Sequence, residues 1–136
     1  MSVYIDSWVW IEFFSQGEKF SISKDTIRGS LSENIVIDTL TLTEVEYSLT
    51  KKIGRDNARE AINLIENIEG IQIIPVNLQI AKYATELRLK YYVSGKREIS
   101  YADVIHLACS ILVQCGIFYT GDPDFKGVEE IKVKVI

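Results

Sequence analysis

Apolar residues along the chain fall into short runs that alternate with longer amphipathic stretches. Short apolar runs bounded by turn residues are typical of strands buried in a sheet. The runs predicted to be strands are 3–5, 35–38, 71–74, 117–119 and 131–135. The last alternates as Ile-Lys-Val-Lys-Val, which indicates a half-exposed strand at the edge of the sheet.

Between these runs the apolar residues recur with helical spacing. The predicted helices are 7–14, a short one ending near 29, 41–53, 55–67, 77–91 and 100–115. Ser23 or Asp25 is the expected cap of the short helix, and Gly54 and Gly116 are the expected stops of two others. Strands that alternate with helices predict a mostly parallel sheet with both faces covered.

The composition is that of one ordinary globular domain, residues 1–136, with 47% hydrophobic and 25% charged residues. Asp6 and Glu12 interrupt the apolar N-terminal stretch, no basic residue precedes it, and no small-residue cleavage site follows it. It is therefore interpreted as a strand and helix, and not as a signal peptide. No run approaches the roughly 18 apolar residues of a membrane span, so we expect a soluble, cytoplasmic protein.

Cysteine and histidine offer little support for a site of their own. Cys109 and Cys115 lie six residues apart in a predicted helix and are expected to be reduced, buried thiols. His106 is the single histidine, which argues against a Cys/His zinc site. The absence of a Gly-x-Ser-x-Gly motif argues against a serine hydrolase.

Acidic residues follow two of the predicted strands. Asp6 comes directly after the first strand, and Asp122 comes shortly after the fourth. Carboxyl ends of parallel strands meet at one edge of a sheet, where ligands bind in such folds. Glu44 and Asp103 lie in the first turns of helices that begin near the same edge if they run antiparallel to the strands. We call these four residues the acidic quartet.

Clustered carboxylates repel one another unless a cation is present. Their hard oxygen atoms suit Mg²⁺ or Mn²⁺, which can activate water and neutralise charge on a phosphate. The quartet therefore favours phosphodiester hydrolysis. The net charge of −4 is a mild argument against a nucleic-acid partner, but it loses weight if the acids gather around a cation.

Each member of the quartet also has a purely structural interpretation. Asp6 could cap the first helix, and Asp122 precedes a proline, which is common in turns. The other two fit capping boxes, namely Thr41-x-x-Glu44 and Ser100-x-x-Asp103. Spacing and charge leave both interpretations open.

Four segments in this order resemble the PIN domain, and more narrowly the VapC-like toxins of toxin–antitoxin pairs. They are Tyr4-Ile5-Asp6-Ser7, Leu42-Thr43-Glu44-Val45, the stretch from Tyr101 to Ala108, and Thr120-Gly121-Asp122-Pro123-Asp124-Phe125. The resemblance extends from Val3 to about Val135. It implies a three-layer α/β/α sandwich with a mostly parallel four- to five-stranded sheet. It also implies Mg²⁺- or Mn²⁺-dependent cleavage of RNA, with metal binding and catalysis at Asp6, Glu44, Asp103 and Asp122.

The same resemblance implies supporting residues and partners. The hydroxyl of Ser7 or Thr120 is expected to orient a carboxylate or a metal-bound water, and Asp124 matches a second acid of the last motif. Trp8 stands where a small residue is frequent and is expected to narrow the rim of the pocket. The implied partners are an RNA substrate, a small antitoxin protein and a second copy of the chain.

Several residues have weaker claims to a function. His106 lies three residues after Asp103 in an apolar helix, which favours a packing or supporting role over a general base. Glu46 is expected to be solvated or to face a second copy of the chain, and Glu12 is expected at the surface. Two basic groups could hold phosphates or be ordinary solvated surface; they are Lys51, Lys52, Arg55 and Arg59, and Arg88, Lys90, Lys96 and Arg97.

Two other functions fit the same scaffold. One is a catalytically silent RNA- or protein-binding module, which a missing effect of Mn²⁺ on thermal stability would favour. The other is a DNA nuclease or a PIN nuclease of RNA maturation. Cleavage tests on single-stranded RNA and DNA would separate them.

Overall fold

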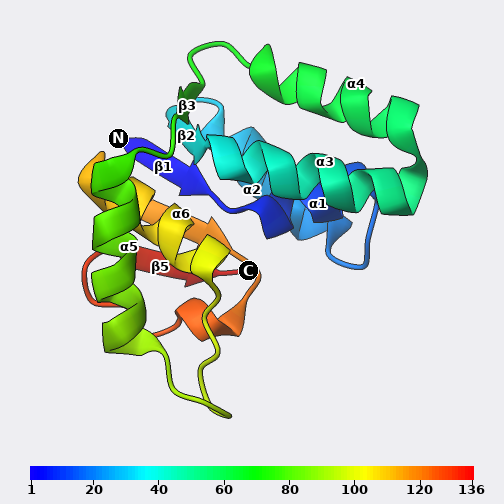
Figure 1. The fold of residues 1–136 in the computed structure, drawn as a ribbon. Coiled ribbons are helices and arrows are strands. Elements are labelled where there is room, and N and C mark those ends of the chain that lie inside the picture. Colours follow the sequence, from blue (N-terminus) through cyan, green and yellow to red (C-terminus); the bar gives the residue numbers. More distant parts are fainter.

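A five-stranded, all-parallel sheet forms the centre of the computed structural model, which describes residues 1–136 (Figure 1). The strands lie in the order β3-β2-β1-β4-β5. Their bounds are β1 (Ser2–Ile5), β2 (Asn34–Asp38), β3 (Gln72–Ile74), β4 (Ile117–Thr120) and β5 (Lys132–Val135). The predicted α/β class is confirmed, and β5 lies at the edge as its alternating pattern indicated.

The order of the strands creates a switch point beside β1. After β1 the chain builds β2 and β3 on one side, then returns to place β4 on the other side. The register pairs Tyr4 with Phe118 and Ile5 with Tyr119, so β1 and β4 end together. The backbone N–H of Asp6 continues the pairing by donating to the carbonyl of Tyr119 at 2.9 Å. This edge is where ligand sites form in open parallel sheets.

Helices cover both faces of the sheet (Figure 1). They are α1 (Ser7–Phe14), α2 (Phe20–Ser30), α3 (Thr39–Ile53), α4 (Arg55–Glu66), α5 (Leu78–Tyr91) and α6 (Tyr101–Leu112). Alternate strand residues point to opposite faces. Tyr4 and Phe118 therefore pack with α5 and α6. Ile5 and Ile37 pack with α1 to α4.

Two helices begin earlier than the sequence predicted. α2 begins at Phe20, so Ser23 and Asp25 lie inside it, and Lys19 at its N-cap makes no side-chain hydrogen bond. Stacking of Phe20 on Phe13, with ring centroids 5.6 Å apart, holds the start of α2 in place of a cap. α3 begins at Thr39 because Asp38 is its cap.

The last long helix is shorter than predicted. α6 ends at Leu112, and Gln114 has a positive φ of 60°, which breaks the helical path. The backbone N–H of Gly116 then donates to the carbonyl of Ser2 at 2.8 Å, in the turn that leads into β4. Cys109 and Cys115 are buried, free thiols, as expected.

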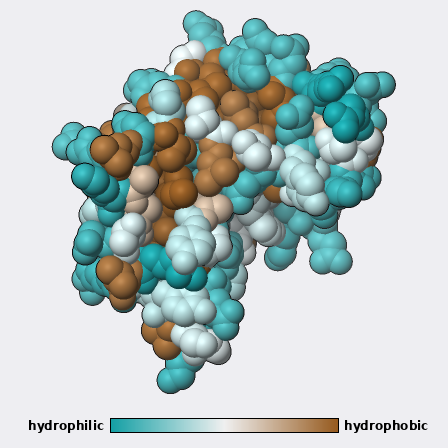
Figure 2. All heavy atoms as spheres, viewed as in Figure 1, coloured by the Kyte–Doolittle hydropathy of each residue, from teal (hydrophilic) through white to brown (hydrophobic).

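Apolar side chains also reach the surface. Figure 2 shows hydrophobic residues gathered in the upper half of the view, where α3, α4 and the start of α5 lie in Figure 1. Leu64, Leu78 and Leu89 are among the exposed large hydrophobic residues. None of the helices has the length and apolar character needed to cross a membrane.

Candidate active site

Asp6 is the most deeply buried member of the acidic quartet. It follows β1, caps α1, and is only 3% exposed. Its Oδ1 accepts from the backbone N–H of Ser7 at 2.8 Å, and its Oδ2 accepts from the hydroxyl of Thr120 at 2.7 Å. Burial raises the pKa of Asp6 to about 6, and the charges of Asp103 and Glu44 add to this. Such a carboxylate gains from a bound cation.

Thr120 joins the ends of the two central strands. Its hydroxyl donates to Asp6 and accepts from the backbone N–H of Asp122 at 3.1 Å. The hydroxyl of Ser7 lies 3.5 Å from Asp6 Oδ1, at the limit of a hydrogen bond. Of the two hydroxyls predicted to support Asp6, Thr120 therefore makes the shorter contact.

Asp122 and Asp124 lie in the turn after β4. Asp122 caps a short 3₁₀ helix, η1 (Pro123–Phe125), and its Oδ1 accepts from the backbone N–H of Asp124 at 2.8 Å. Asp122 is half-buried. The structural role expected of a turn residue is thus present, and its second carboxylate oxygen makes no hydrogen bond within the protein. Asp124 contributes its backbone to this turn, and its carboxylate accepts no hydrogen bond.

Asp103 lies in the first turn of α6. Its Oδ2 accepts from the backbone N–H of Ser100 at 3.0 Å, while the Ser100 hydroxyl accepts from the backbone N–H of Asp103 at 3.1 Å. The predicted capping box is therefore present. Burial raises the pKa of Asp103, and the nearby charge of Asp122 raises it further. Only one oxygen serves the cap, which leaves the other for a ligand.

Glu44 has a different place from the one its capping motif predicted. The capping box of α3 is formed by Asp38 and Thr41, so the Thr41–Glu44 interpretation is wrong. The physical reason is that Asp38, at the end of β2, caps the free N–H groups of the first turn and so starts the helix three residues earlier than a Thr41 cap would. Glu44 Oε1 instead contacts His106 Nε2 on α6.

Behind Glu44 lies a buried polar cluster of four residues: Tyr4, Asp38, Thr41 and His106. Asp38 Oδ2 lies 2.6 Å from the Tyr4 hydroxyl and 2.7 Å from His106 Nδ1. Burial alone would lower the pKa of His106, but hydrogen bonds to Asp38 and Glu44 raise it to about 10. Burial likewise opposes the ionisation of Asp38, yet His106 holds its pKa below the usual value.

Most of this cluster is not apparent from the sequence. Asp38 ends a predicted strand, Tyr4 lies in another, and Thr41 stands at a predicted helix start, and none of these positions indicates a shared polar cluster. One signal was available, since Asp38 ends an apolar strand in the same way that Asp6 does. The expectation that His106 packs and supports, and is not a base, agrees with its complete burial.

The quartet fits a hydrated divalent cation better than a closed cage of ligands. The charges of Asp103 and Glu44 raise the pKa of Asp6, and the charge of Asp122 raises that of Asp103, so each of the four acids lies near at least one other. No three Asp, Glu, His or Cys side chains lie close enough together to hold an ion directly. Mg²⁺ retains several waters and commonly uses only one or two protein carboxylates, so the oxygen donors present suit it.

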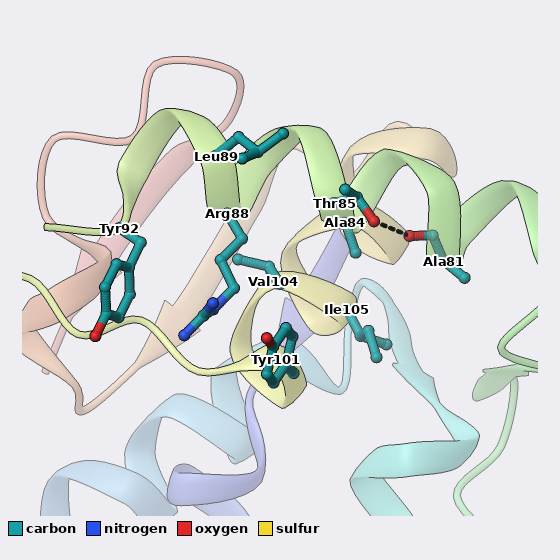
Figure 3. A pocket seen from close by; sticks show the side chains of 9 residues that line it. All are labelled: Ala81, Ala84, Thr85, Arg88, Leu89, Tyr92, Tyr101, Val104 and Ile105. Carbon is teal, nitrogen blue, oxygen red and sulfur yellow. Dashed lines mark hydrogen bonds between the residues drawn. The ribbon is translucent and has the colours of Figure 1, made fainter. Parts of the chain in front are cut away.

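A groove lies between α5 and α6 (Figure 3). It has a volume of about 380 Å³ and is lined mainly by hydrophobic residues. The Arg88 guanidinium lies between two aromatic rings, 4.3 Å from the Tyr92 centroid and 4.1 Å from that of Tyr101. No member of the quartet lines this groove.

Arg88 belongs to the second basic group, which also contains Lys90, Lys96 and Arg97. Most of these side chains make contacts within the protein. Lys90 pairs with Glu130 at 2.9 Å, and Arg97 donates to the carbonyl of Lys126. Arg88 donates to the carbonyl of Ile99 at 3.2 Å. These contacts favour a structural role for most of the group over phosphate binding.

Trp8 packs tightly against the loop that carries Asp122. A Cβ atom added at Gly121 would lie 2.2 Å from Cδ2 of the Trp8 ring. The indole thus occupies the space next to Gly121, which is the residue between Thr120 and Asp122. Whether Trp8 narrows the rim of a pocket stays a prediction.

Gly121→Ala is expected to lower the free energy of unfolding by about 1–3 kcal/mol, because the added methyl group must displace the indole. Urea unfolding followed by tryptophan fluorescence measures this loss. Trp8→Ala in the same chain should recover part of it. Gly29→Ala is the control and should not lower the free energy of unfolding, since a Cβ there meets nothing within 4 Å and alanine favours the helix that contains it. Equal stabilities of Gly121→Ala and the parent protein would contradict the packing described.

Comparison with known proteins agrees with the fold. The family model for the PIN domain matches residues 3–131. No curated protein sequence matches the chain. Among solved structures, VapC20 of Mycobacterium tuberculosis, a sarcin–ricin-loop-cleaving toxin, superposes with a TM-score of 0.77 at 19% identity, covering 95% of this chain and 98% of that one.

Two further structures contain toxin–antitoxin proteins. VapBC2 of Rickettsia felis, bound to a DNA fragment of its promoter, gives a TM-score of 0.74 at 14% identity and covers 99% of this chain and 98% of that one. A toxin–antitoxin complex of Klebsiella pneumoniae gives 0.70 at 21% identity, with coverage of 95% and 94%. At these identities the likeness establishes the fold.

Proposed function

Since this chain belongs to the PIN-domain family, a family of nucleases, we propose that it is a metal-dependent endoribonuclease acting as the toxin of a toxin–antitoxin pair. The observation that carries the proposal is the position of Asp6 and Asp122 just beyond the adjacent carboxyl ends of β1 and β4, with Asp103 and Glu44 near enough to Asp6 to raise its pKa. Mutual repulsion makes such an edge unfavourable when empty and attractive to a divalent cation.

The quartet would hold Mg²⁺ or Mn²⁺. When bound, the cation supplies an activated water and neutralises charge that builds on the phosphate. The chain's own contribution is orientation. Thr120 and the Ser7 amide fix both oxygens of Asp6, and the Ser100 amide fixes one oxygen of Asp103. Side chains held in this way lose little freedom on binding, which is how a preorganised site gains affinity.

The proposed partners are an RNA substrate, a small antitoxin protein and a second copy of the chain. The structural neighbours include toxins in complex with antitoxins, which supports the protein partner.

Glu44→Gln and Asp103→Asn are expected to reduce Mn²⁺-dependent cleavage of single-stranded RNA by ~10-fold to 100-fold or more, since even residues behind a metal's ligands have effects of that size. Cleavage rates with purified protein measure the effect. Glu46→Gln is the matched control, because Glu46 lies on the same helix but is exposed.

Equal loss in all three variants, or in none, would contradict the assigned site. RNA that is bound but left intact, with no effect of Mn²⁺ on thermal stability, would assign the chain to the non-cleaving binding modules. Cleavage of single-stranded DNA in place of RNA would change the substrate and keep the site.

A further inference from the structure

We propose that His106 is the positioning residue of Glu44, holding its carboxylate at the sheet edge before a cation or substrate arrives. The inference rests on the proposed function in so far as Glu44 belongs to the site. The contact between His106 Nε2 and Glu44 Oε1 is the only hydrogen bond that the Glu44 side chain makes. Without it, nothing in the protein fixes which way this long side chain points.

The ring of His106 is itself held from behind. Its Nδ1 lies 2.7 Å from Asp38 Oδ2 and 2.9 Å from the Tyr4 hydroxyl. The other oxygen of Asp38 accepts from the backbone N–H of Thr41 at 3.0 Å. With Nδ1 directed at Asp38, only Nε2 is left for Glu44.

Through Asp38 and His106, residues of β1, α3 and α6 together support the carboxylate of Glu44. Tyr4 comes from β1, Asp38 caps α3, and His106 lies on α6 one turn beyond Asp103. Glu44 lies on α3, so Asp38 fixes the start of the same helix that carries it. The position of Glu44 relative to Asp103 therefore depends on the His106 contact, which joins α3 to α6.

The exposure of the side chains distinguishes the positioning residue, His106, from the residue that it positions, Glu44. The side chains of His106 and Asp38 are both 0% exposed, whereas that of Glu44 is 31% exposed. Both ring nitrogens are engaged, and no part of the ring reaches solvent. A substrate therefore meets Glu44 and not His106, which excludes the histidine as a base in this conformation.

His106→Leu keeps the apolar packing of the ring but removes the donor to Glu44, and His106→Gln keeps a donor. The first measurement is made without metal. Selective ¹³C labelling of glutamate carboxylates should show a Glu44 resonance apart from that of exposed Glu46. In His106→Leu it should move to the position of the exposed glutamates, and in His106→Gln it should move less.

The second measurement is Mn²⁺ affinity, followed by the electron paramagnetic resonance signal of the free ion. His106→Leu is expected to weaken binding ~10-fold to 100-fold. Combined with Glu44→Gln, it should cause no further loss, because both changes remove the same contribution. Ser110→Ala, another buried position on α6, is the control and should leave both signals unchanged.

The two proposals fail in different ways. A parent protein that binds no Mn²⁺ overturns the proposed function, while the metal-free Glu44 resonance still decides the role of His106. An unmoved resonance in folded His106→Leu, or additive losses in the double variant, overturns positioning. If His106→Leu does not fold, Tyr4→Phe removes only the hydroxyl behind the ring and should displace the same resonance by a smaller amount.

Discussion

Asp6→Asn is expected to abolish RNA cleavage while making the metal-free protein more stable. If Asp6 holds the cation as proposed, its removal should reduce the rate at least ~100-fold, the loss that removal of a residue behind a metal ligand can cause. Stability should change in the opposite direction, because the buried Asp6 carboxylate carries an unfavourable charge at neutral pH. Asparagine retains a side-chain oxygen that can cap α1. The expected gain is of the order of 1–3 kcal/mol, set by the raised pKa.

The direction of the stability change follows from the pKa of Asp6. The pKa of Asp6 is about 6 in the folded protein, above its ordinary value near ~3.9 in an unfolded chain. Its contribution to stability is therefore complete below about pH 4 and is lost as the pH rises through about 6. The advantage of Asp6→Asn should be largest at pH 7.5 and should vanish toward pH 4.

Urea unfolding in the presence of a chelator, at both pH values, measures this difference. Asp25→Asn is the control, since Asp25 is exposed on α2. In the parent protein, Mn²⁺ affinity should also fall below pH 6, because protons compete with the ion for Asp6. A destabilised Asp6→Asn at pH 7.5, or one that still cleaves RNA, would contradict the account of this residue.

Asp38→Ala is expected to be the most destabilising single change described here, lowering the free energy of unfolding by about 3–5 kcal/mol. Truncating one member of a buried ion pair leaves its partner charged and unpaired, and losses of that size follow. The Tyr4 hydroxyl and the first turn of α3 lose the same acceptor.

Urea unfolding again measures the loss of free energy of unfolding, and two further variants serve as comparisons. Asp38→Asn keeps an oxygen for the Thr41 amide and removes only the charge, so it should lose less. Asp25→Ala, at an exposed position, should stay within ~0.5 kcal/mol of the parent protein. If Asp38→Ala lost less than about 1 kcal/mol, the buried cluster would not be an ion-paired unit.

The strand pattern made half of the candidate site predictable. Asp6 and Asp122 were placed at one edge because they follow strands, and the all-parallel sheet has its β1 and β4 ends side by side. The five strands themselves could be found because buried runs of this kind depend only on neighbours in sequence.

The rest could not be predicted because it depends on distant partners. Asp38 and His106 are 68 residues apart, and no local pattern joins them. The start of α3 was misplaced because Asp38 and Thr41 are both good caps, and only the end of β2 decides between them. No capping residue stands at the start of α2. Its first residue, Phe20, stacks instead on Phe13, a contact that no capping pattern in the sequence indicates.

The bond between Thr120 and Asp6 spans 114 residues of sequence. Contacts between residues so far apart form late, because the chain entropy lost in closing a long loop precedes the stabilisation that the contact provides. A ribosome releases the Asp6 end of the chain long before β4 emerges. During synthesis, Asp6 therefore emerges well before Thr120 and Asp122, and this part of the acidic quartet can be assembled only after β4 has been made.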